Sequence, residues 1–296
     1  MANMKTVIAN RSDFFAPGCC PIALRTIKGD AAMQHPGDLT DIRHTHDFAE
    51  LIFIMRGGGL HWIDGDVYPV TEGDVFLIQG NTEHYFQERH NLGMYNVMFD
   101  DFYLKDHLHS LRSMPGFNAF FLFEPTCRRS HKFQSRLHID PERLFQATAL
   151  LRQMETENAA ASPGFDLVML AKVLEILVFL SREYSKEKNP MVRSLFRLGE
   201  VISRLENEYL RHWTLADLSH IAAMAPSTLL PVFRKATGRS PIEYLLEVRL
   251  TKAAERLLKT DDPISEVAAA SGFPDSNYFS RCFRRRYNCS PREYRR

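Results

Sequence analysis

Hydrophobic residues recur with a helical period close to the C-terminus of the chain. Asp275 can cap a helix that runs to about Tyr287, and on this helix Phe279, Cys282 and Phe283 share one face. The opposite face is polar and basic, and it carries Ser276, Asn277, Ser280, Arg281, Arg284 and Arg285. Such a face is either the solvated surface of a packed helix or a surface that binds a polyanion.

A shorter predicted helix lies just before this one. We expect it to begin where Asp262 precedes Pro263, because aspartate is a favourable N-cap and proline suits the first helical position. Gly272 can end it, because glycine adopts the left-handed conformation without strain. Two short helices around a tight turn, the second with a basic outer face, predict a helix-turn-helix at about 263–287.

A second copy of this pattern lies upstream. Thr214 and Asp217 form a capping box, and Pro226 begins a helix that Gly238 ends. The residues of that helix that we expect to meet DNA are Ser227, Thr228 and Arg234. Pro231 falls inside the same helix, where it removes a backbone donor and leaves few side chains that can read bases. We therefore expect the first unit to contact mainly the DNA backbone and the second to supply most of the sequence specificity.

One long predicted helix joins the two units, and Ser240 and Glu243 form the capping box that opens it. Two helix-turn-helix units, at about 214–236 and 263–287, joined in this way form a specific arrangement. Together with the segments YLLEVRLTKAAERLL, PISEVAAASGFPDSNYFSRCFRRRY and SPREYR, it resembles the AraC/XylS family of transcription regulators. The resemblance implies a DNA-binding domain over 191–296 that binds double-stranded DNA, a homodimer, and RNA polymerase as a further partner.

Residues 20–100 alternate between apolar and polar positions as strands do. Short runs rich in isoleucine, valine, phenylalanine and tyrosine are separated by turn residues, such as three glycines at 57–59 and Asp-Gly at 64–65. We expect a β-barrel of the cupin or jelly-roll type that fills 1–140, with late strands and connections over 101–140. The predicted fold class is α+β, with a sheet-rich sensor before an all-α DNA-binding domain.

The hydrophobic period becomes helical after Asp140, which can cap a helix that begins at Pro141. A second helix, rich in leucine, valine and isoleucine, follows from Asp166 to Tyr184. We expect residues 141–190 to form a helical layer and a linker, and the family resemblance implies that such helices form a dimer interface.

Side chains that can bind metals are spaced along the predicted strands. His44, His46 and Glu50 point to the same side of the sheet in our prediction, and His84 can close the set one hairpin later. The pattern resembles the two motifs of a cupin, which implies that these four residues are metal ligands. Three imidazoles and one carboxylate suit zinc, iron, nickel or manganese.

The second cupin motif departs from the usual pattern at Gln79, Asn81 and Glu88. Two other interpretations therefore stay open: a set that binds the hydroxyl groups of a sugar, and polar remnants that hydrogen-bond within the barrel. Trp62 can stack on a sugar ring or be an ordinary core residue. The candidate effector-binding residues are His44, His46, Glu50, Trp62 and His84.

Three segments look like the rhamnose-operon activator subgroup of the family. They are HTHDFAELIFIMRGGGLHWIDG, DFFA at 13–16 and PGFN at 115–118. This resemblance implies a small-molecule effector that is a sugar, rhamnose-like in chemistry.

Charge is distributed unevenly along the chain. Residues 191–296 hold 18 lysines and arginines against 12 aspartates and glutamates, while the other 190 residues hold 19 against 24. A basic C-terminal third beside an acidic remainder predicts one polyanion-binding domain and one domain with a different task.

Length and composition are those of an ordinary two-domain protein. The 296 residues are 45% hydrophobic and 25% charged. The N-terminal residues have no apolar core of signal-peptide length, and the longest apolar run, 165–180, is interrupted by charges. We therefore expect a cytoplasmic protein with no membrane partner, whose five cysteines are reduced.

No nucleophile paired with a base and no phosphate-binding loop is apparent in the sequence, so we expect no catalytic residues. The preferred interpretation is a ligand-responsive transcription regulator. One alternative is a metal-dependent cupin oxygenase or isomerase that carries a DNA-binding domain, and substrate turnover would favour it. Another is a repressor-like module whose barrel only dimerises, and DNA binding that no small molecule affects would favour that one.

Overall fold

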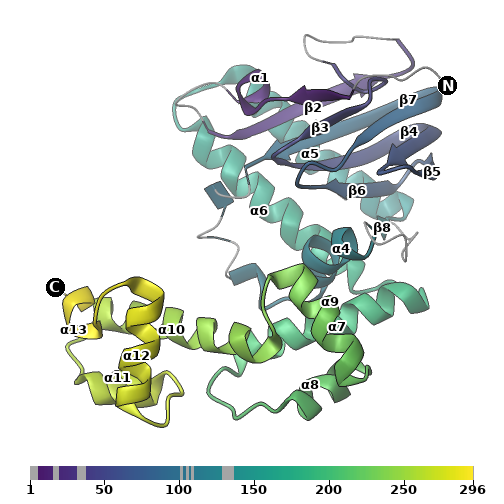
Figure 1. Ribbon diagram of the computed structural model, residues 1–296. Coiled ribbons are helices and arrows are strands. Elements are labelled where there is room, and N and C mark those ends of the chain that lie inside the picture. The colour runs from purple at the N-terminus through teal and green to yellow at the C-terminus, as the bar shows by residue number, and fades with distance from the viewer. Residues whose placement is uncertain are drawn as a thin grey trace. The chain divides into compact units, whose positions relative to one another are not determined.

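Figure 1 shows the chain as a computed structural model. The structure describes residues 6–15, 20–31, 38–100, 103–104, 107, 110–128 and 137–295. Ala16, which ends the DFFA segment, lies outside the described residues.

The chain divides into two compact units. The sheet unit comprises Met1–Leu111 and Glu124–Arg193, and the helical unit comprises Arg112–Phe123 and Ser194–Arg296. The helical unit therefore includes a short segment from the middle of the chain.

The sheet unit is built on one sheet of eight strands. Its main path is β1-β3-β7-β4-β6-β8, while β2 pairs with β7 and β5 pairs with β4. The strands are β1 (Val7–Ala9), β2 (Ile22–Lys28), β3 (His44–His46), β4 (Ala49–Ile63), β5 (Asp66–Thr71), β6 (Asp74–Ile78), β7 (His84–Phe99) and β8 (Leu137–His138). A short helix, α1 (Arg11–Phe14), follows β1.

The expected closed barrel differs from what the pairings show. The two strands at the ends of the path, β1 and β8, are short, and each pairs with a single neighbour. Among the described residues, the pairings therefore leave the sheet open. What agrees with the sequence is a sheet-rich N-terminal part followed by a helical C-terminal part (Figure 1).

One face of the sheet, here called the inner face, carries an apolar cluster of the sheet unit. Ile52 and Ile54 of β4, Met94 of β7 and Ile27 of β2 are buried in one cluster on it. Alternate residues of a strand point to the same face, so these side chains lie in rows that cross the strands. The register places Ile27 opposite Met94, and Met94 opposite Ile54.

Two helices pack on the sheet near β2, as expected. They are α5 (Pro141–Ala160), which Asp140 caps, and α6 (Phe165–Tyr184). The hydroxyl of Thr26 donates a hydrogen bond of 2.9 Å to the carboxylate of Glu155 on α5. Figure 1 shows both helices running behind the strands.

Our expectation of late strands over 101–140 is correct at β8 and wrong at 115–128. The chain is helical from residue 115 to residue 128, in three consecutive pieces. They are α3 (Pro115–Phe117), the π-helix η1 (Asn118–Phe123) and α4 (Glu124–Arg128). Phenylalanines are common in strands, but here tertiary packing overrides that local preference, and three of them are buried within η1.

The helical unit has the expected double helix-turn-helix. The first unit is α8 (Leu215–Ala222) and α9 (Pro226–Thr237), the second is α11 (Ile264–Ala270) and α12 (Ser276–Tyr287), and α10 (Pro241–Lys259) joins them. In addition, α7 (Pro190–Asn207) precedes these helices and α13 (Pro291–Arg295) follows them.

Most of the predicted helix signals are confirmed. Both predicted capping boxes are present, and the Asp275 carboxylate accepts from two backbone N–H groups of α12. Gly272 has a φ of +83°, as a glycine after a helix end should. Asp262 is the exception, because its carboxylate accepts from the Arg256 guanidinium at 2.7 Å and α11 has no side-chain cap.

The segment 112–123 is fastened to α7 by one buried amide. The side-chain amide of Asn118 donates to the Ser203 hydroxyl at 3.0 Å and lies 3.2 Å from the carbonyl oxygen of Gly199. A Cβ atom on Gly199 would lie 2.2 Å from the carbonyl oxygen of Pro115. The close approach of the two backbones therefore requires glycine at position 199.

We predict that Gly199→Ala destabilises the protein. In an open helix this change is favourable by up to about 1 kcal/mol, because alanine is the better helix former. Here the methyl group overlaps backbone that cannot rotate away, so we expect a loss of about 1–3 kcal/mol. Urea denaturation followed by circular dichroism measures it, with the exposed Arg197→Ala in the same helix as the control. A Gly199→Ala protein as stable as the control would contradict the prediction.

Candidate functional site

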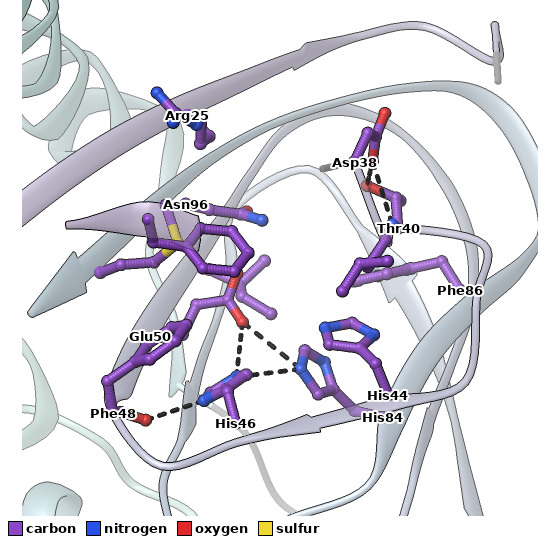
Figure 2. A pocket seen from close by; sticks show the side chains of 14 residues that line it. Arg25, Asp38, Thr40, His44, His46, Phe48, Glu50, His84, Phe86 and Asn96 are labelled. Atoms are coloured by element: carbon purple, nitrogen blue, oxygen red, sulfur yellow. Dashed lines mark hydrogen bonds and ion pairs between the residues drawn. The ribbon is translucent and has the colours of Figure 1, made fainter. Parts of the chain in front are cut away.

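Four side chains converge at one end of the inner face (Figure 2). They are His44 and His46 from β3, Glu50 from β4 and His84 from β7. All four are buried, and one ligand atom from each lies within 4.8 Å of the others. The structure therefore brings together all four residues that the sequence predicted as a metal-binding set.

The register of the strands produces this convergence. His44 lies opposite His84 in the antiparallel pair of β3 and β7. His46 is two residues further along β3 and so points to the same face, and Glu50 points there from β4. The Nε2 atom of His46 lies 3.1 Å from a carboxylate oxygen of Glu50 and 3.2 Å from Nε2 of His84.

Backbone carbonyl groups fix the tautomers of two of the histidines. Nδ1 of His46 donates to the carbonyl oxygen of Phe48 at 2.8 Å, and Nδ1 of His44 donates to that of Ile42 at 2.7 Å. Each neutral ring then presents a lone pair at Nε2 to the cluster. Burial lowers the pKa of His44, which favours this neutral form.

A fourth histidine, His61, lies behind His84. Its Nε2 atom is 3.3 Å from Nδ1 of His84, and burial lowers the pKa of both groups well below the usual value. If Nδ1 of His84 donates in this pair, Nε2 of His84 also presents a lone pair to Glu50. His61 was not among the predicted site residues, although a histidine on a strand beside a suspected cluster is a usable signal.

Trp62, a predicted effector residue, is not part of the cluster. Its ring stacks on Tyr85 with the centroids 5.8 Å apart, while its neighbour His61 faces the inner side. The register of β4 against β7 shifts three times between Ile54 and Leu60. These irregularities change which residues of β4 face inward, so Trp62 points to the other face.

The geometry fits a cation. Nε2 of His46, Nε2 of His84 and the Glu50 carboxylate lie 3.1–3.4 Å from one another, and a ring nitrogen of His44 lies within 4.8 Å of them. In the tautomer of His84 whose Nδ1 donates to His61, no hydrogen remains between these atoms and their lone pairs repel one another; in the other tautomer, Nε2 of His84 donates to Glu50. A divalent ion would relieve this repulsion, and the donor set is one that zinc, iron, nickel or manganese accepts.

The cluster lies in a small pocket of the sheet unit. Phe14, Phe48 and Phe86 are among the side chains around it, and Asp38, Thr40, Arg25 and Asn96 add polar groups. The space in it that the centres of water molecules can occupy is about 30 Å³. This is room for about two waters, so the pocket as it stands suits a hydrated ion better than a sugar ring.

The second predicted site lies on α12 of the helical unit. Asn277, Arg281, Arg284 and Arg285 are exposed, and Ser276 and Ser280 are partly exposed. Phe279, Cys282 and Phe283 are buried on the opposite side, as expected. The helix therefore presents a basic, hydrogen-bonding face to solvent, and the apolar face holds it in place.

The first helix-turn-helix presents a different surface. Ser227, Thr228 and Arg234 of α9 are exposed, as predicted, and Arg234 lies 3.7 Å from Glu243. Pro231 is also exposed, and α9 continues through it from Pro226 to Thr237. The misfit of proline in a helix is thus accommodated on the solvent side, at the centre of the face that could read bases.

Two family models match this chain, one over its N-terminal part and one over its C-terminal part. Residues 32–176 match the AraC-like ligand binding domain, and residues 218–296 match a helix-turn-helix domain. The chain is a member of the AraC family. The family resemblance seen in the sequence is therefore confirmed, and the AraC-type chain is a DNA-binding transcription regulator rather than an enzyme.

Curated relatives cover most of this AraC-family chain. The HTH-type transcriptional activator RhaR of Mannheimia succiniciproducens is 27% identical over 252 residues, which are 85% of this chain and 86% of that protein. The protein of the same name from Yersinia pestis is 28% identical over 259 residues, 86% of this chain and 85% of its own.

Solved structures also match. The DNA-binding domain of AdpA in complex with a target DNA is 29% identical, covers 33% of this chain and 89% of that one, and has a TM-score of 0.33. A regulator with an AraC-type DNA-binding domain from Chromobacterium violaceum is 29% identical, covers 33% and 88%, and has a TM-score of 0.32. In the described part of the chain, no helix is both long enough and apolar enough to cross a membrane.

We predict that Arg281 reads a base and that Arg285 does not. Arg281 shares its face with Asn277 and Ser280 near the start of α12, where a guanidinium can bond a guanine edge with two hydrogen bonds. Arg281→Ala should cost about 1–3 kcal/mol of binding free energy and relax the preference at one base pair. Arg285→Ala should weaken binding to all sequences alike. Binding to a panel of mutated operators tests this, and a uniform loss for Arg281→Ala would contradict it.

Proposed function

We propose that this protein is an effector-responsive transcription activator whose effector binds in the pocket of the sheet unit, on a divalent metal ion. The observation that carries the proposal is the convergence of four buried acceptor groups in a chain that also has two DNA-reading helices. His44, His46, Glu50 and His84 would hold the ion, and His61 would orient His84. When bound, the ion would supply a positive centre to which an oxygen atom of the effector attaches.

The open sheet is compatible with a cupin-like barrel, which we propose as the finer description of the sheet unit. Long strands β4 and β7 pair along most of their length, and β2, β3 and β6 extend the sheet around the cluster. Such a curved sheet excludes water from the inner face and leaves the pocket as the place for a ligand.

The effector that we propose is a sugar or a close chemical relative of one. The rhamnose-activator motifs in the sequence support this class, and the relatives named RhaR share most of the chain. A sugar ring needs more room than two waters, so an aromatic side chain such as Phe48 would have to move. Direct binding of a sugar by the histidines, without an ion, is the second candidate, because neutral imidazoles also bond hydroxyl groups.

The protein is proposed to act as a homodimer in the cytoplasm, together with RNA polymerase. A dimer would present four reading helices along one face of the DNA, two from each chain. The helices α5 and α6 are the proposed dimer interface, because α6 exposes the apolar side chains of Leu167 and Val168.

We predict that the purified protein contains close to one divalent ion per chain. Glu50→Gln keeps the size of the side chain but removes its charge, so the ion content should fall markedly. Chelation should lower the melting temperature of the wild type and leave that of Glu50→Gln nearly unchanged. His90→Ala, at an exposed histidine, is the control and should retain the ion. Elemental analysis with a thermal-shift assay decides, and an ion-free wild type would favour the direct sugar site.

The two DNA-reading helices should differ in sequence preference. We expect α9 to hold the DNA backbone through Ser227, Thr228 and Arg234, because Pro231 occupies the centre of its exposed face. Substitutions in the half-site under α9 should therefore change affinity less than those under α12. Footprinting on a mutated operator measures both. Equal base preference in the two half-sites would contradict this assignment.

A further inference from the structure

Two polar residues interrupt the apolar rows of the inner face. Of three successive rows across β2, β7 and β4, the row farthest from Glu50 is Ile27, Met94 and Ile54, which is entirely apolar. The next row toward the cluster is Arg25, Asn96 and Ile52. The row after it is Ala23, Met98 and Glu50. Arg25 and Asn96 therefore lie one row away from Glu50, on the same face.

Both polar residues have a buried atom that no described group satisfies. Nε of Arg25 and Oδ1 of Asn96 are buried, and neither has a hydrogen-bond partner in the described part of the protein. Leaving a buried donor or acceptor unpaired costs about 1–3 kcal/mol. A pair of strands, β2 and β7, that places two such groups opposite each other is better explained by a ligand than by folding alone.

Nε of Arg25 and Oδ1 of Asn96 require different ligand groups. Nε of Arg25 is a donor on a planar cation, and such a cation matches the oxygens of a carboxylate. Oδ1 of Asn96 is an acceptor and therefore needs a ligand hydrogen, as on a hydroxyl group. Both residues line the same pocket as the cluster, and Figure 2 shows them on the far side of Glu50 from His46.

The positions of Arg25 and Glu50 bound the span of the ligand. The two residues are one row apart along the strands, roughly 7 Å, and they lie on the two strands that flank β7, roughly 10 Å apart. Their backbones are therefore roughly 12 Å apart, and a ligand bridges the part of this distance that the two side chains leave open.

The charges around the pocket also favour an acidic ligand when a divalent ion is bound. Arg25 and a divalent ion contribute three positive charges, and Glu50 and Asp38 contribute two negative ones. A ligand with one carboxylate would neutralise the remainder, whereas a neutral sugar would leave a net charge in a largely enclosed space.

We infer that the effector is a hydroxy acid, such as an acidic sugar, whose carboxylate binds Arg25 and whose hydroxyl groups face Asn96 and the ion. This inference rests on the proposed metal site and specifies the class of ligand that the site selects. It distinguishes acidic ligands from neutral sugars of the same carbon skeleton.

Calorimetric titration of the zinc-loaded full-length protein tests the inference. The probes are D-glycerate, L-rhamnonate and D-galacturonate, each compared with its neutral counterpart, glycerol, L-rhamnose or D-galactose. At least one acid should bind ten or more times tighter than its counterpart. Arg25→Gln should abolish this preference without changing the zinc content, and Arg25→Lys should keep part of it because the charge remains.

The possible failures are distinguishable. A neutral sugar that binds as tightly as its acid, an Arg25→Gln protein that keeps the preference, or no binding of any acid would overturn the inference while zinc binding stands. Loss of zinc binding by the wild type would instead overturn the proposed metal site. An Arg25→Gln protein that retains zinc and its melting temperature shows that the substitution has not unfolded the sheet.

Discussion

The register between β7 and its two neighbours is the constraint on which the ligand pocket depends. Glu50 faces Met98, and Arg25 faces Asn96, because β2, β7 and β4 are aligned residue by residue. A slip of one residue would turn every one of these side chains to the opposite face. The apolar row formed by Ile27, Met94 and Ile54 penalises such a slip, since it would break up the buried cluster that these three side chains form on the inner face. The packing of the core therefore fixes the register that places the polar groups.

The same sheet also tolerates local irregularity where the site requires it. The register shifts of β4 near Gly57 and Gly58 turn His61 inward, behind His84. Gly57 has a φ of +69°, and a Cβ atom there would lie 2.3 Å from a backbone oxygen of β7. A glycine run that looks like an ordinary turn in the sequence is instead a set of bulges inside one long strand.

How much the sequence predicts depends on the range of the interactions involved. The helix starts at Thr214, Ser240 and Asp275 were predictable, because a cap involves residues only two or three positions apart. The set of His44, His46, Glu50 and His84 was predictable because strand alternation and one hairpin suffice to bring it together.

What could not be predicted depends on distant parts of the chain. The face of Trp62 follows from bulges that only the pairing with β7 reveals. Asp262 forms an ion pair with Arg256 near the end of α10 instead of capping α11, a contact outside the two or three positions that a cap involves. The aromatic segment at 115–123 is helical because its partners are in α7 and α9, about eighty or more residues later. Local propensity carries no information on such partners.

That segment also contains one of the points where the chain passes between the two units. A ligand changes DNA binding only through a difference in its affinity for two arrangements of the protein, and such couplings are typically about 1–3 kcal/mol. The chain crosses between the two units after Leu111, Phe123 and Arg193. At the second crossing, Phe123 packs near Phe233 of α9, and α4 begins at the next residue.

Hydrogen bonds link α4 to the strand beside the candidate pocket. Arg128 of α4 donates to the carbonyl oxygen of Leu77 on β6, and Glu50 is paired with Ile78 on the same strand. Both contacts are buried and therefore costly to break, so α4, β6 and β4 are expected to move together. Under the proposed function, a ligand that displaces Glu50 would act on β6. The helix α4, which bonds β6 through Arg128, follows Phe123 by a single peptide bond, and Phe123 packs near Phe233 of α9. The segment 115–128 thus has residues in both units, the sheet unit with the proposed sensing site and the helical unit with α9 and α12. The sequence alone assigns this segment to neither role.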